Sequence, residues 1–491
     1  MFGDFPISKL AKDDPVRRLL RKPDFQRETN HWSPEQIATF IASFVDGEVI
    51  PSLIFWKSAS FIFVIDGGHR LSALRAWMED DYGDRAISGE FFGGEISEEQ
   101  KKVAKKARTI IEDKIGRFST LRELVDSDSA TELQKRRAIA LTTRTIPVQW
   151  IQGTAVVAET SFFKINSQGT PLDETEGMLI KNRRKAVAIG ARAIIRAGAG
   201  HKYWSAFPED RQRKIEEIAA SYYTDFFKPE LKEPLKTLEL PIAGSVSPVD
   251  ALSLLIEFLS ITGARSPQGK PIAAYTDDAT GDETIEMLNN SRQIMRRITG
   301  NSSESLGLHP AIYFYNERGK YSRFLFLGMV LLLTERVRNN DGAFFKKFTA
   351  VRPQLEKFLA ENKSLIGIIL QNLAKAQRVP KMRDMFMFVI SRSNSGESIA
   401  PEEVMKHLGL RGRVFDVVAS QTTPQFSDDT KAKIFVSQAL AGAMECPICH
   451  GKLAPHKSVS YDHILRVREG GLGEAENGAL VHPYCNSAIK S

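Results

Sequence analysis

The chain has 491 residues, of which 42% are hydrophobic and 26% are charged, and its formal net charge is +7. This balance is typical of folded globular proteins, so it excludes disordered and fibrous classes, and the length predicts two or three domains. The positive charge favours a polyanionic partner. The longest apolar run, Phe324 to Leu333, is too short to cross a membrane, and residues 1–6 do not resemble a secretion signal. We therefore expect a cytoplasmic protein with no membrane partner.

The first marked element is a helix that follows an arm or first strand over residues 1–23. Ser33 is a suitable N-cap residue, and Gln36 completes a capping box with it. Apolar residues then recur at helical spacing, which predicts a helix over 34–45.

Two apolar runs, 52–56 and 61–65, predict strands, and the second leads directly into a helix. Gly67 and Gly68 at this junction would let a ligand approach the backbone closely, and a helix N-terminus offers unpaired N–H groups. Arg70, in the first turn, could pair with a phosphate through two hydrogen bonds. The junction therefore indicates either a phosphate site or a tight turn with a surface arginine.

Residues 80–145 are polar and charged, which predicts a helical insertion with a solvated or DNA-contacting face. A strand is expected over 146–151, with Pro147 at a sheet edge or at the start of the strand. Residues 159–176 predict two helices joined by a polar loop. A basic stripe follows, made of Lys181, Arg183, Arg184, Lys185, Arg192 and Arg196. We interpret this stripe as a phosphate contact or as a soluble helix face.

The stretch from 205 to 440 is mostly helical by its periodicity and carries no chemical motif. Apolar residues repeat at helical spacing over 251–261, 283–298, 321–338 and 344–359. We expect this stretch to be a helical spacer, or the surface that senses a DNA modification. A linker over 420–429 then precedes a short helix.

All three cysteines of the chain lie near its end, in a pattern that suits a metal ion. Cys446 and Cys449 form a CxxC pair, and His482 and Cys485 form an HxxC pair. Three sulfurs and one nitrogen at this spacing can surround one zinc ion, which leaves no cysteine for a disulfide. Two other histidines are alternative fourth ligands: His450 and His456.

An Asp-His dipeptide lies between the two ligand pairs. Asp462 and His463 end an apolar and aromatic segment that predicts a strand, and zinc would hold this strand on a scaffold too small to have its own core. A histidine supplies a base near neutral pH, and a hard cation on carboxylate and amide oxygens neutralises charge on a phosphate. The pattern therefore favours phosphodiester hydrolysis over a zinc ribbon without chemistry.

The order CxxC, Asp-His-Ile, Gly-Gly, Asn and a final Cys-Asn resembles the HNH, or ββα-metal, nuclease family. The resemblance implies that His463 is the general base and that Asp462 and Asn486 hold a catalytic Mg²⁺ or Mn²⁺. It implies that Asn477 orients the base or braces the loop. Structural zinc would bind Cys446, Cys449, His482 and Cys485, where the family usually has a cysteine in place of His482.

The N-terminal part is similar to the N-terminal domain of GmrSD-type restriction enzymes, a branch of the ParB-like NTPase fold. The resemblance depends on Asp24 to Arg27, on Ile50-Pro51, on Asp66 to Arg70, and on the segment that contains Asn166 and Gly169. Gly68 and His69 replace the two glutamines of the usual Asp-Gly-Gln-Gln-Arg motif. The resemblance implies an NTP site formed by Arg27, Asp66, Gly67, Gly68, His69, Arg70, Asn166 and Gly169.

These observations predict an α+β multidomain protein. We expect a ParB-like α/β domain over 1–185, a helical domain over 186–430, and a ββα-metal HNH domain with structural zinc over 431–491. By resemblance, the protein would be a nucleotide-regulated, metal-dependent DNA endonuclease of a restriction or anti-phage system, with NTPase activity in the first domain. Its partners would be DNA, including modified phage DNA, and an NTP, and an oligomer is compatible with this reading.

Two alternative functions stay open. One is a nucleotide-switched DNA-binding or partitioning factor whose zinc module has no catalytic role. The other is a toxin-like nuclease that acts on RNA.

Overall fold

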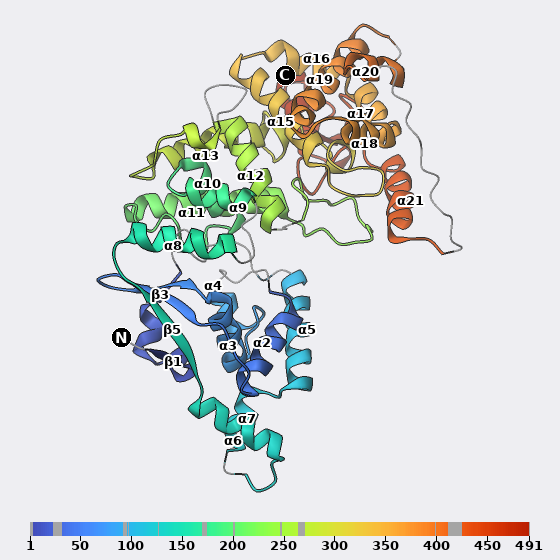
Figure 1. Cartoon of the computed structure of the whole chain (residues 1–491). Coiled ribbons are helices and arrows are strands. Elements are labelled where there is room, and N and C mark those ends of the chain that lie inside the picture. The colour runs from blue at the N-terminus through green and yellow to red at the C-terminus, as the bar shows by residue number, and fades with distance from the viewer. Residues whose placement is uncertain are drawn as a thin grey trace. The chain divides into compact units, whose positions relative to one another are not determined.

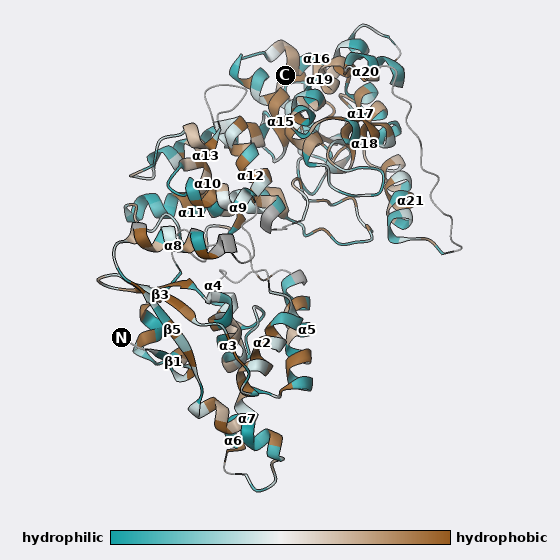
Figure 2. Ribbon diagram, viewed as in Figure 1, coloured by the Kyte–Doolittle hydropathy of each residue, from teal (hydrophilic) through white to brown (hydrophobic). Residues whose placement is uncertain are grey.

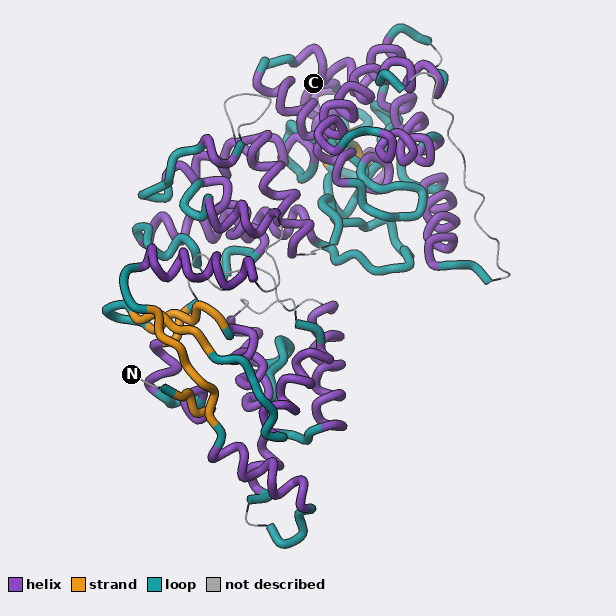
Figure 3. The backbone as a smooth tube through the Cα atoms, viewed as in Figure 1, coloured by secondary structure: helices purple, strands orange, loops and turns teal. Residues whose placement is uncertain are grey.

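The computed structural model describes residues 3–490 except 23–31, 92–95, 97, 126, 169–173, 200–201, 246–247, 264–270, 398 and 411–424. The chain forms two compact units, each described here by itself (Figure 1). The N-terminal unit comprises residues 1–183 and 199–203, and the C-terminal unit comprises residues 184–198 and 204–491. Figure 3 shows that the larger sheet belongs to the N-terminal unit and that helices dominate the C-terminal unit.

A five-stranded mixed sheet forms the centre of the N-terminal unit. Its strands are β1 (Asp4–Pro6), β2 (Leu20–Arg21), β3 (Leu53–Lys57), β4 (Ile62–Asp66) and β5 (Thr145–Ile151), in the order β1-β5-β3-β4-β2. β5 is antiparallel to β1 and parallel to β3, β3 is antiparallel to β4, and β4 is parallel to β2.

Helices surround this sheet. They are η1 (Ile7–Leu10), α1 (Pro15–Leu19), α2 (Pro34–Val45), α3 (Gly68–Glu79), α4 (Ala86–Phe91), α5 (Glu98–Lys114), α6 (Phe118–Glu123), α7 (Glu132–Thr143), α8 (Ala155–Gln168) and α9 (Glu174–Lys181). The predicted helix over 34–45 is confirmed as α2, with the Ser33–Gln36 capping box in place. The expected strands before α3 are confirmed with shifts of one residue.

Both faces of the sheet are covered, because successive residues of a strand point to opposite faces. Leu53 and Phe55 of β3 pack into a core with α2, α3 and α5. Ile54 and Trp56 point the other way and pack against a second cluster, which α8 and α9 help to form. Figure 2 shows hydrophobic and hydrophilic residues alternating along α5, whose apolar stripe faces the first core.

Pro147 lies near the start of β5, but not at an edge of the sheet as one of our alternatives had it. It is the third residue of β5, opposite Asp4 of β1, and the pairing with β3 starts one residue later at Val148. Proline has no N–H to donate in a sheet, and Pro147 lies at the position where the pairing partner of β5 changes from β1 to β3. The next N–H, that of Val148, donates to the Gly3 carbonyl at 2.9 Å.

The C-terminal unit is mainly helical. Its elements up to residue 441 are α10 (Ala186–Ile195), α11 (Glu209–Phe227), α12 (Pro248–Gly263), η2 (Ile272–Ala274), α13 (Asp282–Ile298), α14 (Pro310–Tyr313), α15 (Arg323–Arg338), α16 (Gly342–Ala350), α17 (Arg352–Glu361), α18 (Lys363–Asn372), α19 (Lys375–Asn394), α20 (Pro401–His407) and α21 (Asp428–Ala441). The predicted helix that contains the run Phe324–Leu333 is confirmed as the buried α15. No helix in the described part of the chain has the length and apolar character needed to cross a membrane.

The periodic stretch 344–359 is helical as expected, and it forms two helices, α16 and α17, which meet at Val351. Pro353 near the start of α17 explains the break, because proline cannot donate the N–H that a continuous helix needs. Arg192 cannot contact a phosphate with the rest of the basic stripe, because α10 is buried and Arg192 is 0% exposed.

The chain ends in a small module, residues 445–490, which we call the C-terminal module. It contains β6 (Ser460–His463), η3 (Val467–Glu469), η4 (Ala475–Asn477), β7 (Gly478–Val481) and the helical turn η5 (Cys485–Ile489). β6 and β7 form an antiparallel pair in which His463 lies opposite Gly478. The strand expected at Asp462 and His463 is therefore confirmed, and the two strands are followed by a short helical turn.

Candidate metal centre and nuclease site

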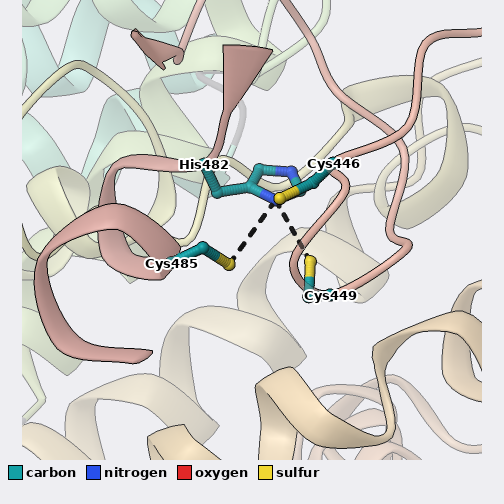
Figure 4. A group of neighbouring side chains, drawn as sticks. All are labelled: Cys446, Cys449, His482 and Cys485. Carbon is teal, nitrogen blue, oxygen red and sulfur yellow. Dashed lines mark hydrogen bonds between the residues drawn. The ribbon is translucent and has the colours of Figure 1, made fainter. Parts of the chain in front are cut away.

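Four side chains of the C-terminal module converge on one point, as Figure 4 shows. Cys446, Cys449, His482 and Cys485 are all buried, and their potential ligand atoms lie within 4.8 Å of one another. The Cys449 sulfur lies 3.3 Å from His482 Nδ1, and the Cys485 sulfur lies 4.0 Å from it. Neighbouring ligand atoms of a tetrahedral zinc site with these ligand types lie roughly 3.5–3.8 Å apart. The group could therefore bind a structural zinc ion.

The orientation of the His482 ring fits this role. Its Nε2 faces the Lys452 carbonyl at 3.2 Å. Because a carbonyl can only accept, Nε2 carries the proton, and Nδ1 is left as the lone-pair donor toward the sulfurs. Burial and the nearby Arg352 guanidinium lower the pKa of His482, so the ring is neutral, as a metal ligand must be.

The pKa values of the three thiols are strongly coupled, and this coupling favours a bound cation. Hydrogen bonds from the Cys449 and Cys485 thiols lower the pKa of Cys446. The same closeness to Cys446 raises the pKa of Cys449 to about 11 and that of Cys485 still further. One thiolate thus forms at the expense of the other two, and a bound Zn²⁺ would remove this competition by stabilising all three.

The two other histidines near this motif are not part of the cluster. Among the described residues, the four convergent side chains do not include His450 or His456, and both of these are exposed. His482 is therefore the histidine that lies at the cluster.

Ser460 and Asp462 lie two residues apart in β6 and so point to the same face of the strand, toward the helical turn η5. The Ser460 hydroxyl accepts a 2.8 Å hydrogen bond from Asn486 Nδ2, which also donates to the Tyr461 carbonyl at 3.3 Å. Asn486 therefore lies beside the residue that precedes Asp462. Its Oδ1 has no donor within the described part of the chain, and neither does Asp462 Oδ1. These two hard oxygens are the type of ligand that Mg²⁺ and Mn²⁺ prefer.

His463 is the last residue of β6 and is half-buried. Its ring makes no hydrogen bond to any residue that the structure describes, so both ring nitrogens remain available to water or to a ligand. Asn477 lies on the opposite side of the connecting loop. Its Oδ1 accepts from the Leu465 N–H at 2.7 Å, and its Nδ2 donates to the Leu465 and Leu472 carbonyls at 3.1 and 2.9 Å. Asn477 thus braces the loop that follows His463, and its side-chain hydrogen bonds go to Leu465 and Leu472 and not to the His463 ring.

One residue at this site was not singled out from the sequence. Lys490 Nζ lies 2.5 Å from Asp462 Oδ2 and also donates to the His463 carbonyl. Lys490 follows Asn486 by four residues, the spacing at which two side chains of a helical turn share a face. This four-residue spacing from Asn486 was the signal in the sequence that could have pointed to Lys490.

The C-terminal module is anchored to the helices of its own unit by the loop after α13. The Tyr484 N–H donates to the Ser305 carbonyl at 2.9 Å, and the Ser458 hydroxyl donates to the Gly300 carbonyl at 2.6 Å. Gly307 in this loop has φ +56°, and a Cβ there would lie 2.9 Å from His482 Cδ2. The metal cluster is therefore packed directly against the helical body.

In the N-terminal unit the junction between β4 and α3 forms as expected. Gly67 is the N-cap of α3 in the left-handed conformation, with φ +94°, and a Cβ there would lie 2.3 Å from Leu53 Cδ2. Arg70 Nη2 donates to Asp66 Oδ2 at 2.6 Å and to the Ser52 carbonyl at 3.1 Å. Its Nε is buried without a partner in the described part of the chain. The His69 ring stacks on Trp32 with the ring centres 5.8 Å apart.

The other residues expected at the nucleotide site cannot be added to this description. Arg27 and Gly169 lie outside the described residues. Asn166 lies in α8, but its side chain is outside the description. The structure thus brings together Asp66, Gly67 and Arg70, and the participation of the remaining residues stays a prediction.

Comparison with protein families identifies the N-terminal region. Residues 7–184 match the model of the GmrSD restriction endonuclease N-terminal domain. Neither the curated proteins nor the solved structures give a significant match. The match implies a family of restriction or defence endonucleases that act on DNA, and the cysteine and histidine cluster is compatible with an HNH-like module. Residues 7–184 are therefore a GmrSD-type N-terminal domain.

Proposed function

We propose that the C-terminal module is an HNH nuclease centre that hydrolyses DNA phosphodiester bonds with a divalent cation. The observation that carries this proposal is the placement of Asp462 and His463 at the end of β6, beside Asn486 of η5, on a scaffold that the zinc-type cluster fixes. A restriction-type N-terminal domain in the same chain supports DNA as the substrate.

Each side chain then has a distinct task. His463, with its ring nitrogens open, accepts the proton of the attacking water. Asp462 and Asn486 present hard oxygens to Mg²⁺ or Mn²⁺. When bound, this cation neutralises the charge that develops on the phosphate oxygens. Asn477 holds the loop after His463 through hydrogen bonds to Leu465, and this restrains the backbone position of the base.

Plasmid cleavage tests this proposal. His463→Ala should lower the cleavage rate by about 10²–10⁴-fold with Mg²⁺ or Mn²⁺, the range that a general base contributes. His450→Ala is the matched control, because His450 is exposed and lies outside the cluster, and it should cleave like the wild-type protein. Equal cleavage by His463→Ala and wild-type protein would reject the nuclease assignment.

The same assay separates the alternative functions. A non-catalytic DNA-binding factor would retain DNA without cutting it under any metal condition. A toxin-like nuclease would prefer RNA in a side-by-side comparison with DNA. A comparison of modified and unmodified phage DNA tests whether cutting depends on the modification.

We further propose that the β4–α3 junction of the N-terminal domain binds the phosphates of an NTP and regulates cutting. The lack of a side chain at Gly67, the N-terminal end of α3 with its positive dipole end and the Arg70 guanidinium support this role. Arg70→Ala should abolish nucleotide stimulation and leave the zinc content unchanged. Arg75→Ala removes a half-exposed arginine of the same helix, which pairs with Glu79, and should retain stimulation.

A further inference from the structure

The carboxylate that we assign to the catalytic cation already has a cation beside it. Lys490 Nζ lies 2.5 Å from Asp462 Oδ2, and the two side chains are 22% and 13% exposed. The same ammonium also donates to the backbone carbonyl of His463. Both contacts of Lys490 therefore fall on the dipeptide that the nuclease proposal uses.

An ammonium and a divalent ion cannot share one carboxylate without a penalty. Three positive charges would then face one negative charge, and the two cations would lie only a few ångströms apart. Even in a water-like medium, charges of +2 and +1 at about 5 Å repel enough to weaken binding about tenfold, and partial burial increases this effect. The bound metal and the Lys490 contact therefore exclude each other electrostatically.

The lysine side chain is the part that can move. The Lys490 carbonyl is held by the Arg466 guanidinium, and the Lys490 N–H donates to the Cys485 carbonyl at 3.0 Å. The backbone is thus fixed to the zinc-type cluster, whereas the four-carbon stem of lysine is flexible. Release of the ammonium from Asp462 needs only a rotation of this stem, without any change in the helical turn.

We infer that Lys490 is an internal counter-cation that competes with the catalytic metal ion for Asp462. In the metal-free protein it neutralises Asp462, and divalent binding requires its displacement. Lys490 thus acts through Asp462, and it sets the concentration of divalent metal ion that is needed to occupy the catalytic site. This inference rests on the proposed nuclease function, because it takes Asp462 as a ligand of the catalytic cation.

Mn²⁺ binding to the full-length, zinc-loaded protein tests the inference without any cleavage assay. The free Mn²⁺ remaining during a titration can be measured by electron paramagnetic resonance. Lys490→Met keeps the length of the side chain and removes its charge, so the Mn²⁺ dissociation constant should fall about tenfold. Lys490→Arg keeps the charge and should stay closer to the wild-type value than Lys490→Met.

Lys433→Met is the matched control. Lys433 lies on an exposed position of α21 and makes no contact with Asp462, so the same loss of one charge should change the Mn²⁺ dissociation constant by less than about twofold. An unchanged or weaker Mn²⁺ affinity in Lys490→Met would overturn the competition. An equal gain of affinity in Lys433→Met would overturn it as well, because the effect would then be one of net charge alone.

Asp462→Asn separates a failure of this inference from a failure of the proposed function. Loss of Mn²⁺ binding in Asp462→Asn supports Asp462 as the ligand, and the Lys490 result then decides the competition by itself. Wild-type Mn²⁺ binding in Asp462→Asn would reject the metal site of the proposed function and this inference with it. Zinc content, measured on every variant, reports whether the cluster that carries the helical turn is intact.

Discussion

Arg352 and Glu356 form a buried ion pair, with Arg352 Nε and Glu356 Oε1 only 2.6 Å apart. The Arg352 guanidinium also donates to the carbonyls of Leu306 and Gly307, at 2.5 and 2.9 Å. Glu356 Oε2 accepts from the Lys452 N–H at 2.7 Å. The pair therefore joins α17, the loop after α13 and the C-terminal module in one polar network.

Glu356→Ala should lower the free energy of unfolding of the C-terminal unit by about 3–5 kcal/mol, because it leaves a buried guanidinium without its counter-charge. Chemical denaturation followed by tryptophan fluorescence measures the change. Glu361→Ala, which removes an exposed glutamate from the same helix, should cost less than about 1 kcal/mol. Similar losses in the two variants would show that the buried network does not stabilise the unit.

Removal of one cluster ligand should release zinc and destabilise the surrounding structure. Cys449→Ser should lower the zinc content from one ion per chain toward none, because an alcohol is a much poorer zinc ligand than a thiolate. The C-terminal unit should then unfold at a lower temperature, since zinc binding contributes to folding.

Zinc content by atomic spectrometry and thermal unfolding are the two measurements for this prediction. His450→Ala and His456→Ala should keep their zinc, because neither ring lies in the cluster. His482→Cys should also keep it. Retention of zinc by Cys449→Ser and its loss from His456→Ala would mean that the ligand set is different.

Gly67→Ala should destabilise the N-terminal unit by roughly 1–3 kcal/mol or more. The residue would need a left-handed conformation, and its Cβ would clash with Leu53. Gly177→Ala in α9 is the matched control, because a Cβ there meets nothing within 4 Å and alanine favours a helix. Gly177→Ala should therefore be neutral or stabilising by up to about 1 kcal/mol. Denaturation curves of the two variants give the comparison directly.

His309 predicts a pH dependence of stability. Burial, together with nearby His456, Arg352 and Lys363, lowers the pKa of His309 to about 3. The unfolded chain therefore binds the proton more tightly than the folded chain between pH 3 and about 6.5. Stability contributed by the neutral ring is present above pH 6.5 and is lost as the pH falls through this window, by about 1.4 kcal/mol per pH unit.

Urea denaturation at pH 7.0 and pH 5.5 tests whether the stability falls with pH as predicted. The wild-type protein should lose about 1.2 kcal/mol more than His309→Gln over this interval, since glutamine does not titrate and the histidine of the unfolded chain becomes substantially protonated only below about pH 7. The comparison at equal pH cancels the acid sensitivity of the metal cluster, which both proteins share. An identical loss in both proteins would show that His309 titrates normally.

Local patterns in the sequence were enough to place the main elements. The capping box at Ser33, the strand before Asp66 and the apolar stretch that became α15 each predicted the observed element. The spacing of the three cysteines and His482 predicted the cluster, because a tetrahedral ion allows few other arrangements.

Burial that depends on packing between distant parts of the chain could not be predicted from local patterns. Arg192 fits the pattern of a surface stripe, yet α10 is enclosed by α11, α12 and α13, and no local signal reports this. The ion pair of Arg352 with Glu356 has the spacing of an ordinary surface pair, and only the fold makes it a buried link. Lys490 escaped notice because its contact with Asp462 depends on how η5 packs on β6.

The two outer strands of the five-stranded sheet are very short. β1 has three residues and β2 has two, so each of these outer strands by itself offers few free N–H and carbonyl groups to another chain. Exposed strand margins are where polypeptides recruit further strands and begin to form fibrillar deposits. The N-terminal unit should accordingly tolerate high concentration during expression and storage without stacking through its sheet.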